Sequence, residues 1–132
     1  MKIPNINCKI KMVCPINLSE NPEKVKQAIS NIFPFSDIQN ENFSIKAQSY
    51  ELRSLEKIYE TIISTKSQKS YIRNLENNLQ DEKTWFFLNK QAAFVEKIAI
   101  CDEVEESPLG PIKVILTSSN IDGIIDWLAF AK

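Results

Sequence analysis

The chain has 132 residues, of which 43% are hydrophobic and 25% charged, a composition typical of one globular domain with its own core. Sixteen basic residues and seventeen acidic ones give a net charge of −1, so no overall attraction draws the chain to nucleic acid. The absence of histidine excludes Ser-His-Asp and Cys-His catalytic arrangements and histidine-ligated zinc.

Hydrophobic periodicity predicts nine elements. In chain order we expect a strand at 8–16, a helix at 22–33, a strand at 43–48, helices at 52–63 and 71–79, strands at 84–88, 94–100 and 112–116, and a helix at 121–128. Asn21 suits a helix cap and Pro22 the first helical position. Ser119 and Asp122 resemble a capping box that opens the last helix.

This order predicts an α+β fold, a single domain over residues 1–132. We expect a two-layer sandwich in which helices pack on one face of a mixed sheet, in the order β-α-β-α-α-β-β-β-α, since the three consecutive strands should pair antiparallel. The strand at 84–88 carries Trp85 and Phe87 on one face and Phe86 and Leu88 on the other. Apolar residues on both faces favour a strand that is covered on both sides.

Three cysteines, Cys8, Cys14 and Cys101, form no C-x-x-C pair. A secreted disulfide framework needs an even and denser set, so we expect a reducing, cytoplasmic location. Cys8 and Cys14 fall on the apolar face of the first strand and should be small packing residues. No apolar stretch reaches the length of a membrane span, so we expect no membrane partner.

Recognisable catalytic and cofactor motifs are missing from the sequence. Its two glycines, Gly110 and Gly123, are too few for a phosphate-binding loop or a dinucleotide fingerprint. The acidic run at 102–106 could hold a divalent metal or act as acid and base, but its position beside a turn favours a solvated loop. We therefore predict no enzyme activity, no cofactor and no metal.

Positive charge gathers in two segments. Residues 1–19 hold three lysines and no acid, and residues 64–73 contribute Lys66, Lys69 and Arg73, again without an acid. Basic residues between two helices could clamp the phosphates of structured RNA, although a solvated lysine-rich surface is the alternative. The aromatic strand at 84–88 could stack bases or form a dimer interface.

The chain resembles an archaeal protein family, family 0201, whose members are described as RNA-binding-like or as predicted exosome subunits. The resemblance rests on the segments 21–25, 54–57, 87–93, 108–112 and 127–129, together with Arg73. It implies an α+β fold similar to large-subunit ribosomal protein five and a function in RNA binding.

Within that resemblance, Lys90 and Gln91 are expected in a turn between two strands. Lys90 would contact a phosphate and Gln91 a ribose or a base edge; alternatively, Gln91 bonds the turn backbone and Lys90 stays solvated. Arg73 would grip phosphate or pair with a glutamate such as Glu76, Glu56 or Glu60.

The sequence thus predicts a non-catalytic, cytoplasmic protein that contacts structured RNA through Lys66, Lys69, Arg73, Lys90 and Gln91. Proteins of an RNA-processing complex are further expected partners. The alternative is a protein-interaction or homodimerising module that uses the aromatic strand and the acidic loop.

Overall fold

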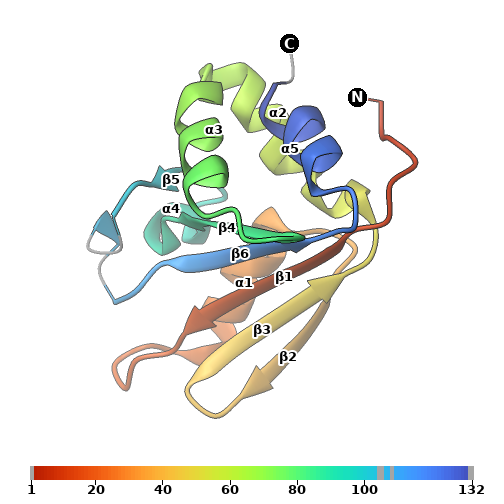
Figure 1. Ribbon diagram of the computed structural model, residues 1–132. Coiled ribbons are helices and arrows are strands. Elements are labelled where there is room, and N and C mark those ends of the chain that lie inside the picture. The colour runs from red at the N-terminus through yellow and green to blue at the C-terminus, as the bar shows by residue number, and fades with distance from the viewer. Residues whose placement is uncertain (1, 104–105, 108, 131–132) are drawn as a thin grey trace.

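Strands from both halves of the chain form one sheet in the computed structural model, which describes all residues except 1, 104–105, 108 and 131–132 (Figure 1). The strands are β1 (Lys9–Pro15), β2 (Asp37–Glu41), β3 (Ser44–Ser49), β4 (Lys83–Leu88), β5 (Ile100–Cys101) and β6 (Ile112–Thr117). They are arranged in the order β2-β3-β1-β6-β4-β5. The predicted α+β class is confirmed.

The expectation of a mixed sheet is wrong, because each hydrogen-bonded pair of strands in the described part of the chain is antiparallel. β1 and β2 do run in the same direction, as a strand–helix–strand connection requires, but β3 lies between them. Further along the chain, a pair of helices separates β3 from β4, so the chain returns to the sheet in the opposite direction.

The helices lie on one face of this sheet, which confirms the predicted two-layer sandwich. They are α1 (Pro22–Ile32), α2 (Glu56–Thr65), α3 (Gln68–Asn77), α4 (Lys90–Phe94) and α5 (Ile121–Ala129), with a 3₁₀ turn at Leu52–Leu55. In Figure 1, α2, α3 and α5 lie above the sheet, and α1 lies behind β1 and β3. Alternate side chains of β1, namely Ile10, Met12 and Cys14, are fully buried beneath them.

Two elements differ from the sequence prediction. From the sequence no element is predicted at Asp37–Glu41 because these residues are mostly polar, yet this largely exposed segment pairs with β3 as the edge strand β2. The segment predicted as a strand at 94–100 contributes only Ile100–Cys101 to the sheet. Before it, Asn89 caps the short helix α4 by accepting a hydrogen bond from the Ala92 amide, so the expected turn at Lys90 and Gln91 is the first turn of a helix.

Helix ends follow the sequence closely at α1 and less closely at α5. Asn21 caps α1 and Pro22 occupies its first turn, as predicted. At α5 the cap is Asn120, whose side chain accepts from the Gly123 amide at 3.2 Å, instead of the expected Ser119. A Cβ atom on Gly123 would lie 2.7 Å from the capping side chain of Asn120 and 2.8 Å from the side chain of Ile6, so glycine leaves room for both.

No helix in the described part of the chain is long and apolar enough to cross a membrane.

Candidate nucleic-acid interface

The face of the sheet opposite the helices is rich in lysine. We call it the open face, and it comprises the side chains of β1–β4 and β6 that point away from the core. Its lysines are Lys9, Lys11, Lys46, Lys83 and Lys113. Figure 1 shows no helix in front of β1, β3 and β6 on this side. The sheet therefore has one apolar face against the helices and one largely polar face.

The strand register brings aromatic residues and lysines of the open face together. Trp85 of β4 lies opposite Ile115 of β6, which in turn lies opposite Lys11 of β1. In the next row, Phe87 lies opposite Lys113. The Lys113 ammonium is 4.8 Å from the centroid of the Trp85 ring, a cation–π contact. Both aromatic side chains are half-buried, and no helix among the described residues packs over them, so this side of the strand is only partly covered.

Acidic residues of the open face are confined to its β2 edge, where Asp37 and Glu41 lie. Glu41 is already engaged, since the ammonium of Lys46 is 2.9 Å from its carboxylate. The remaining strip, formed by β1, β6 and β4, carries lysines without a neighbouring acid on the same face. This strip is the most extended cationic surface that the register of the sheet builds.

The predicted basic cluster on α2 and α3 is on the helical side of the sheet. Lys66 ends α2 in a left-handed conformation, and Lys69 and Arg73 follow one turn apart on α3. All three are exposed. Arg73 donates a hydrogen bond to Asp102 at 2.7 Å, a partner that differs from the glutamates considered above. This hydrogen bond holds the pKa of Asp102 below its ordinary value.

Lys90 is fully buried, so its expected exposure in a turn is wrong. Its ammonium donates to the carboxylate of Glu20 at 2.9 Å and to the backbone carbonyls of Pro15 at 2.9 Å and Leu109 at 2.8 Å. Burial alone would raise the pKa of Glu20, but hydrogen bonds from Asn17 and Lys90 hold it below the ordinary value. Lys90 thus connects α4 to the end of β1, to the β1–α1 loop and to the loop before β6, and its charge is not accessible to a phosphate.

Gln91 follows Lys90 directly in the sequence, but the two side chains lie in different environments. It is exposed on the first turn of α4, whereas Lys90 points into the protein. Neither residue lies on a strand of the open face. The two residues expected to act as one RNA contact are therefore not brought together.

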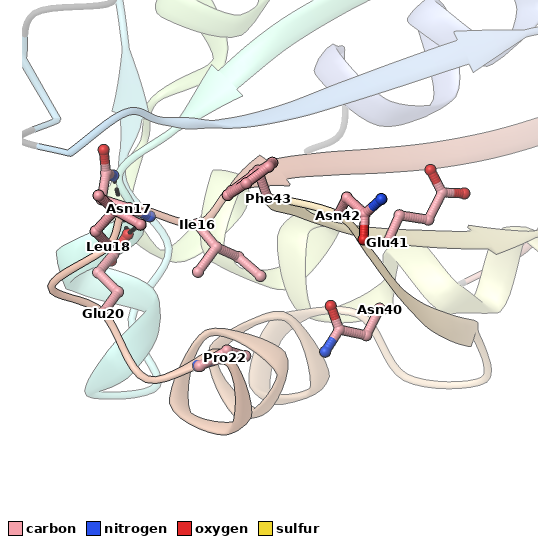
Figure 2. A pocket seen from close by; sticks show the side chains of 9 residues that line it. All are labelled: Ile16, Asn17, Leu18, Glu20, Pro22, Asn40, Glu41, Asn42 and Phe43. Carbon is pink, nitrogen blue, oxygen red and sulfur yellow. Dashed lines mark hydrogen bonds between the residues drawn. The ribbon is translucent and has the colours of Figure 1, made fainter.

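A hollow of about 550 Å³ lies between the β1–α1 loop and the β2–β3 turn (Figure 2). Leu18 and Phe43 on its rim are 97% and 75% exposed. Its two carboxylates are both paired, Glu20 with Lys90 and Glu41 with Lys46. The hollow is therefore lined by amides and apolar side chains, together with one buried carboxylate, Glu20, and one exposed but paired carboxylate, Glu41.

The cysteines and the acidic loop do not form a reactive site in the described residues. All three cysteines are buried and free, and burial raises the pKa of Cys8 to about 11 and that of Cys14 to about 12. No group of three metal-ligating side chains occurs among the described residues. Of the acidic run, Glu105 lies outside the described residues, and Glu106 accepts a hydrogen bond from the Asp102 amide.

Comparison with known proteins identifies the family of this chain. A family model described as RNA binding matches residues 9–117. A UPF0201 protein of Methanothermobacter thermautotrophicus is 37% identical over 124 residues, which cover 92% of this chain and 90% of the relative. One crystal structure of a UPF0201 protein superposes with a TM-score of 0.77 at 27% identity, covering 92% of each chain. Another, from Methanococcus jannaschii, superposes with a TM-score of 0.76 at 26% identity, covering 94% of each chain. The chain therefore belongs to the UPF0201 family.

Proposed function

We propose that this chain is a non-catalytic RNA-binding protein that contacts backbone phosphates across the open face of its sheet. The proposal rests on the row of lysines beside Trp85 and Phe87, on a face that none of the described helices covers. The family model described as RNA binding supports RNA as the polyanion. Lysines that neutralise phosphates release counterions, so a local cationic strip gives affinity even when the whole chain is nearly neutral.

The spacing of the lysines suits an extended chain of phosphates. Lys9 and Lys11 are two residues apart on β1, and Lys113 lies on the neighbouring strand β6. Residues two apart on a strand are separated by roughly 7 Å, and neighbouring strands by roughly 5 Å. Several ammonium groups therefore lie within reach of successive phosphates without rearrangement of the backbone.

The predicted contacts Lys66, Lys69 and Arg73 stay in the proposal as a second phosphate-binding cluster for structured RNA. Their position on the helical layer separates them from the open face. One nitrogen of the Arg73 guanidinium is already bonded to Asp102, whose negative charge offsets the positive charge of Arg73 and lowers its contribution to phosphate binding. We expect this cluster to add less affinity than the open face, and Gln91 to add least.

The test is a titration of a fluorescently labelled RNA hairpin, followed by anisotropy. We expect the double variant Lys11→Glu/Lys113→Glu to lose affinity by about tenfold or more, because two attractive contacts become repulsive. The matched control, Lys66→Glu/Lys69→Glu, makes the same change in net charge on the helical layer and should lose less. An equal loss in both variants would show binding by net charge alone, and no binding by the wild type would contradict the proposal.

A second candidate function is a protein-interaction or homodimerising module, favoured by the exposure of Leu18 and Phe43 beside the hollow. Phe43 also has a positive φ of 61°, a conformation that costs a non-glycine residue about 1 kcal/mol. Sedimentation of the wild type and of Leu18→Ser/Phe43→Ser tests this candidate. A concentration-dependent mass that the variant abolishes would support it, and a strict monomer would remove the homodimer.

We further propose a cytoplasmic location. Three unpaired thiols fit the cytoplasm. Association with an RNA-processing complex, and the likeness to large-subunit ribosomal protein five, remain predictions from the family resemblance.

A further inference from the structure

We infer that the open face binds an unpaired segment of RNA, with a nucleobase stacked on Trp85 while Lys113 contacts the adjoining phosphate. This inference rests on the proposed function and names the class of RNA that the same surface takes. It differs from the expectation of a duplex read by its phosphates alone. Unpaired RNA is favoured by Trp85 and Phe87, two aromatic residues on the side of the sheet that faces away from the core.

Two aromatic side chains on this face, Trp85 and Phe87, are partly exposed, which gives a base partial access to their rings. Trp85 and Phe87 lie two residues apart on β4 and point away from the core, whereas Phe86 between them is fully buried against Tyr71 of α3. A sheet face that needed only to bind phosphates would not require large aromatic rings among its lysines. Aromatic platforms flanked by cations are the usual way in which proteins hold single-stranded nucleic acid.

Lys113 and Trp85 together match the two parts of one nucleotide. The ammonium lies over the indole ring, 4.8 Å from its centroid, so a base that stacks on this face takes its place. The displaced ammonium then remains close enough to contact the phosphate of that nucleotide. Lys11, two strands away from Trp85 across Ile115, extends the cationic row in the same direction. In a duplex the faces of the bases are covered by their neighbours, so only an unpaired base can use the ring.

Charge also argues against a second copy of the chain as the occupant. A two-fold pairing of the open face with itself would bring lysines such as Lys9, Lys11 and Lys113 against the lysine-rich face of the other copy. Asp37 and Glu41 are the only acids of the five strands on that face, and both lie on the β2 edge. The face is therefore complementary to a polyanion and repels its own copy.

The experiment uses the two tryptophans as separate reporters. Trp127 is on α5, stacked on Tyr59 at 5.1 Å, in the helical layer. The variant Trp127→Phe leaves Trp85 as the sole tryptophan, and Trp85→Phe leaves Trp127. Each is titrated with an unstructured RNA oligonucleotide and with the duplex formed by that oligonucleotide and its complement. We expect the unpaired RNA to quench the fluorescence of Trp85 and to leave that of Trp127 unchanged.

Affinities then separate stacking from phosphate binding. We expect Trp85→Leu to weaken binding of the unpaired RNA by about five- to tenfold and binding of the duplex by less than about twofold, with Trp85→Phe restoring most of the loss. Because quenching is measured with Trp85 in place, the result does not depend on how well Trp85→Leu folds.

Each other outcome has a distinct meaning. Binding of both RNAs with equal affinity and without quenching of Trp85 overturns the inference and leaves the proposed function standing. Failure to bind either RNA contradicts both. A change of molecular mass with Trp85→Leu in light scattering would point to a second copy of the chain on this face and overturn the inference.

Discussion

Lys90 and Lys113 carry the same charge in opposite surroundings. Lys90 is fully buried, and every acceptor around its ammonium, including the carboxylate of Glu20, belongs to the protein. Lys113 lies half-buried on the open face, and its ammonium contacts the ring of Trp85. The comparison shows that one lysine stabilises the fold with its charge, while the other presents its charge to a ligand.

The largest expected effect is a loss of stability when the buried pair of Lys90 and Glu20 is removed. Lys90→Met removes the cation that pairs with the carboxylate of Glu20 and the donor to the carbonyls of Pro15 and Leu109, so we expect the free energy of unfolding to fall by about 3–5 kcal/mol. Urea unfolding followed by circular dichroism measures the loss. The exposed Lys97→Met should change stability by less than about 0.5 kcal/mol. A loss below about 1 kcal/mol for Lys90→Met would contradict a structural role for the pair.

The buried pair should also make stability depend on acid pH. The pKa of Glu20 is lowered in the folded protein, so its contribution is fully present above the unfolded value of about 4.3 and is lost as the pH falls through the folded pKa. We expect Glu20→Gln to be much less stable than the wild type at neutral pH, and the gap to narrow in acid. Glu60→Gln, an exposed control, should run parallel to the wild type. A gap that is constant with pH would show that the charge of Glu20 is not the cause.

The salt dependence of RNA affinity tests whether Lys113 on the open face contacts a phosphate. Each lysine that neutralises a phosphate contributes about 0.7–0.9 to the slope of log affinity against log salt. Lys113→Met should therefore reduce that slope by nearly one, with little change in stability. Lys66→Met is the matched control on α2 and should reduce the slope less. An unchanged slope for Lys113→Met would place the phosphates elsewhere.

The smallest expected effect concerns the exposed pair of Arg73 and Asp102. Both side chains are about half exposed, with 55% and 46% of their surface in solvent, so their hydrogen bond adds little stability. We expect Asp102→Asn to change the free energy of unfolding by less than about 1 kcal/mol, measured in the same urea assay. A loss as large as that of Lys90→Met would erase the distinction between buried and exposed pairs.

Most of the fold could be predicted, because the spacing of apolar residues along the chain shows which side of each strand or helix is buried. The alternation at 8–16 gives β1, and Asn21 with Pro22 gives the start of α1. β2 could not be found this way, because an exposed edge strand has no apolar side to alternate. The segment at 94–100 was wrongly predicted as a strand because Phe94, Ile98 and Ile100 are apolar. The signal against a strand was Asn89, which caps the helix α4, and this helix runs to Phe94.

Less of the site could be predicted, because its residues meet only in the sheet. The partners of Lys90 come from positions 15, 20 and 109, so no local signal marks that lysine as buried. The lysines near the N-terminus were noticed, but Lys46 and Lys113 lie alone on their strands and become neighbours of the others only through the register. The sequence signal for their position was that Lys46 and Lys113 each stand between two apolar residues of a strand, which places them on the face opposite the core.

The central claim is that RNA lies on the open face, and mapping of amide chemical shifts by NMR during titration with RNA tests it most directly. We predict that the largest shifts fall on β1, β6 and β4, with the indole N–H of Trp85 among them and that of Trp127 unmoved. Shifts concentrated on the turn between α2 and α3, or around Leu18 and Phe43, would contradict the account.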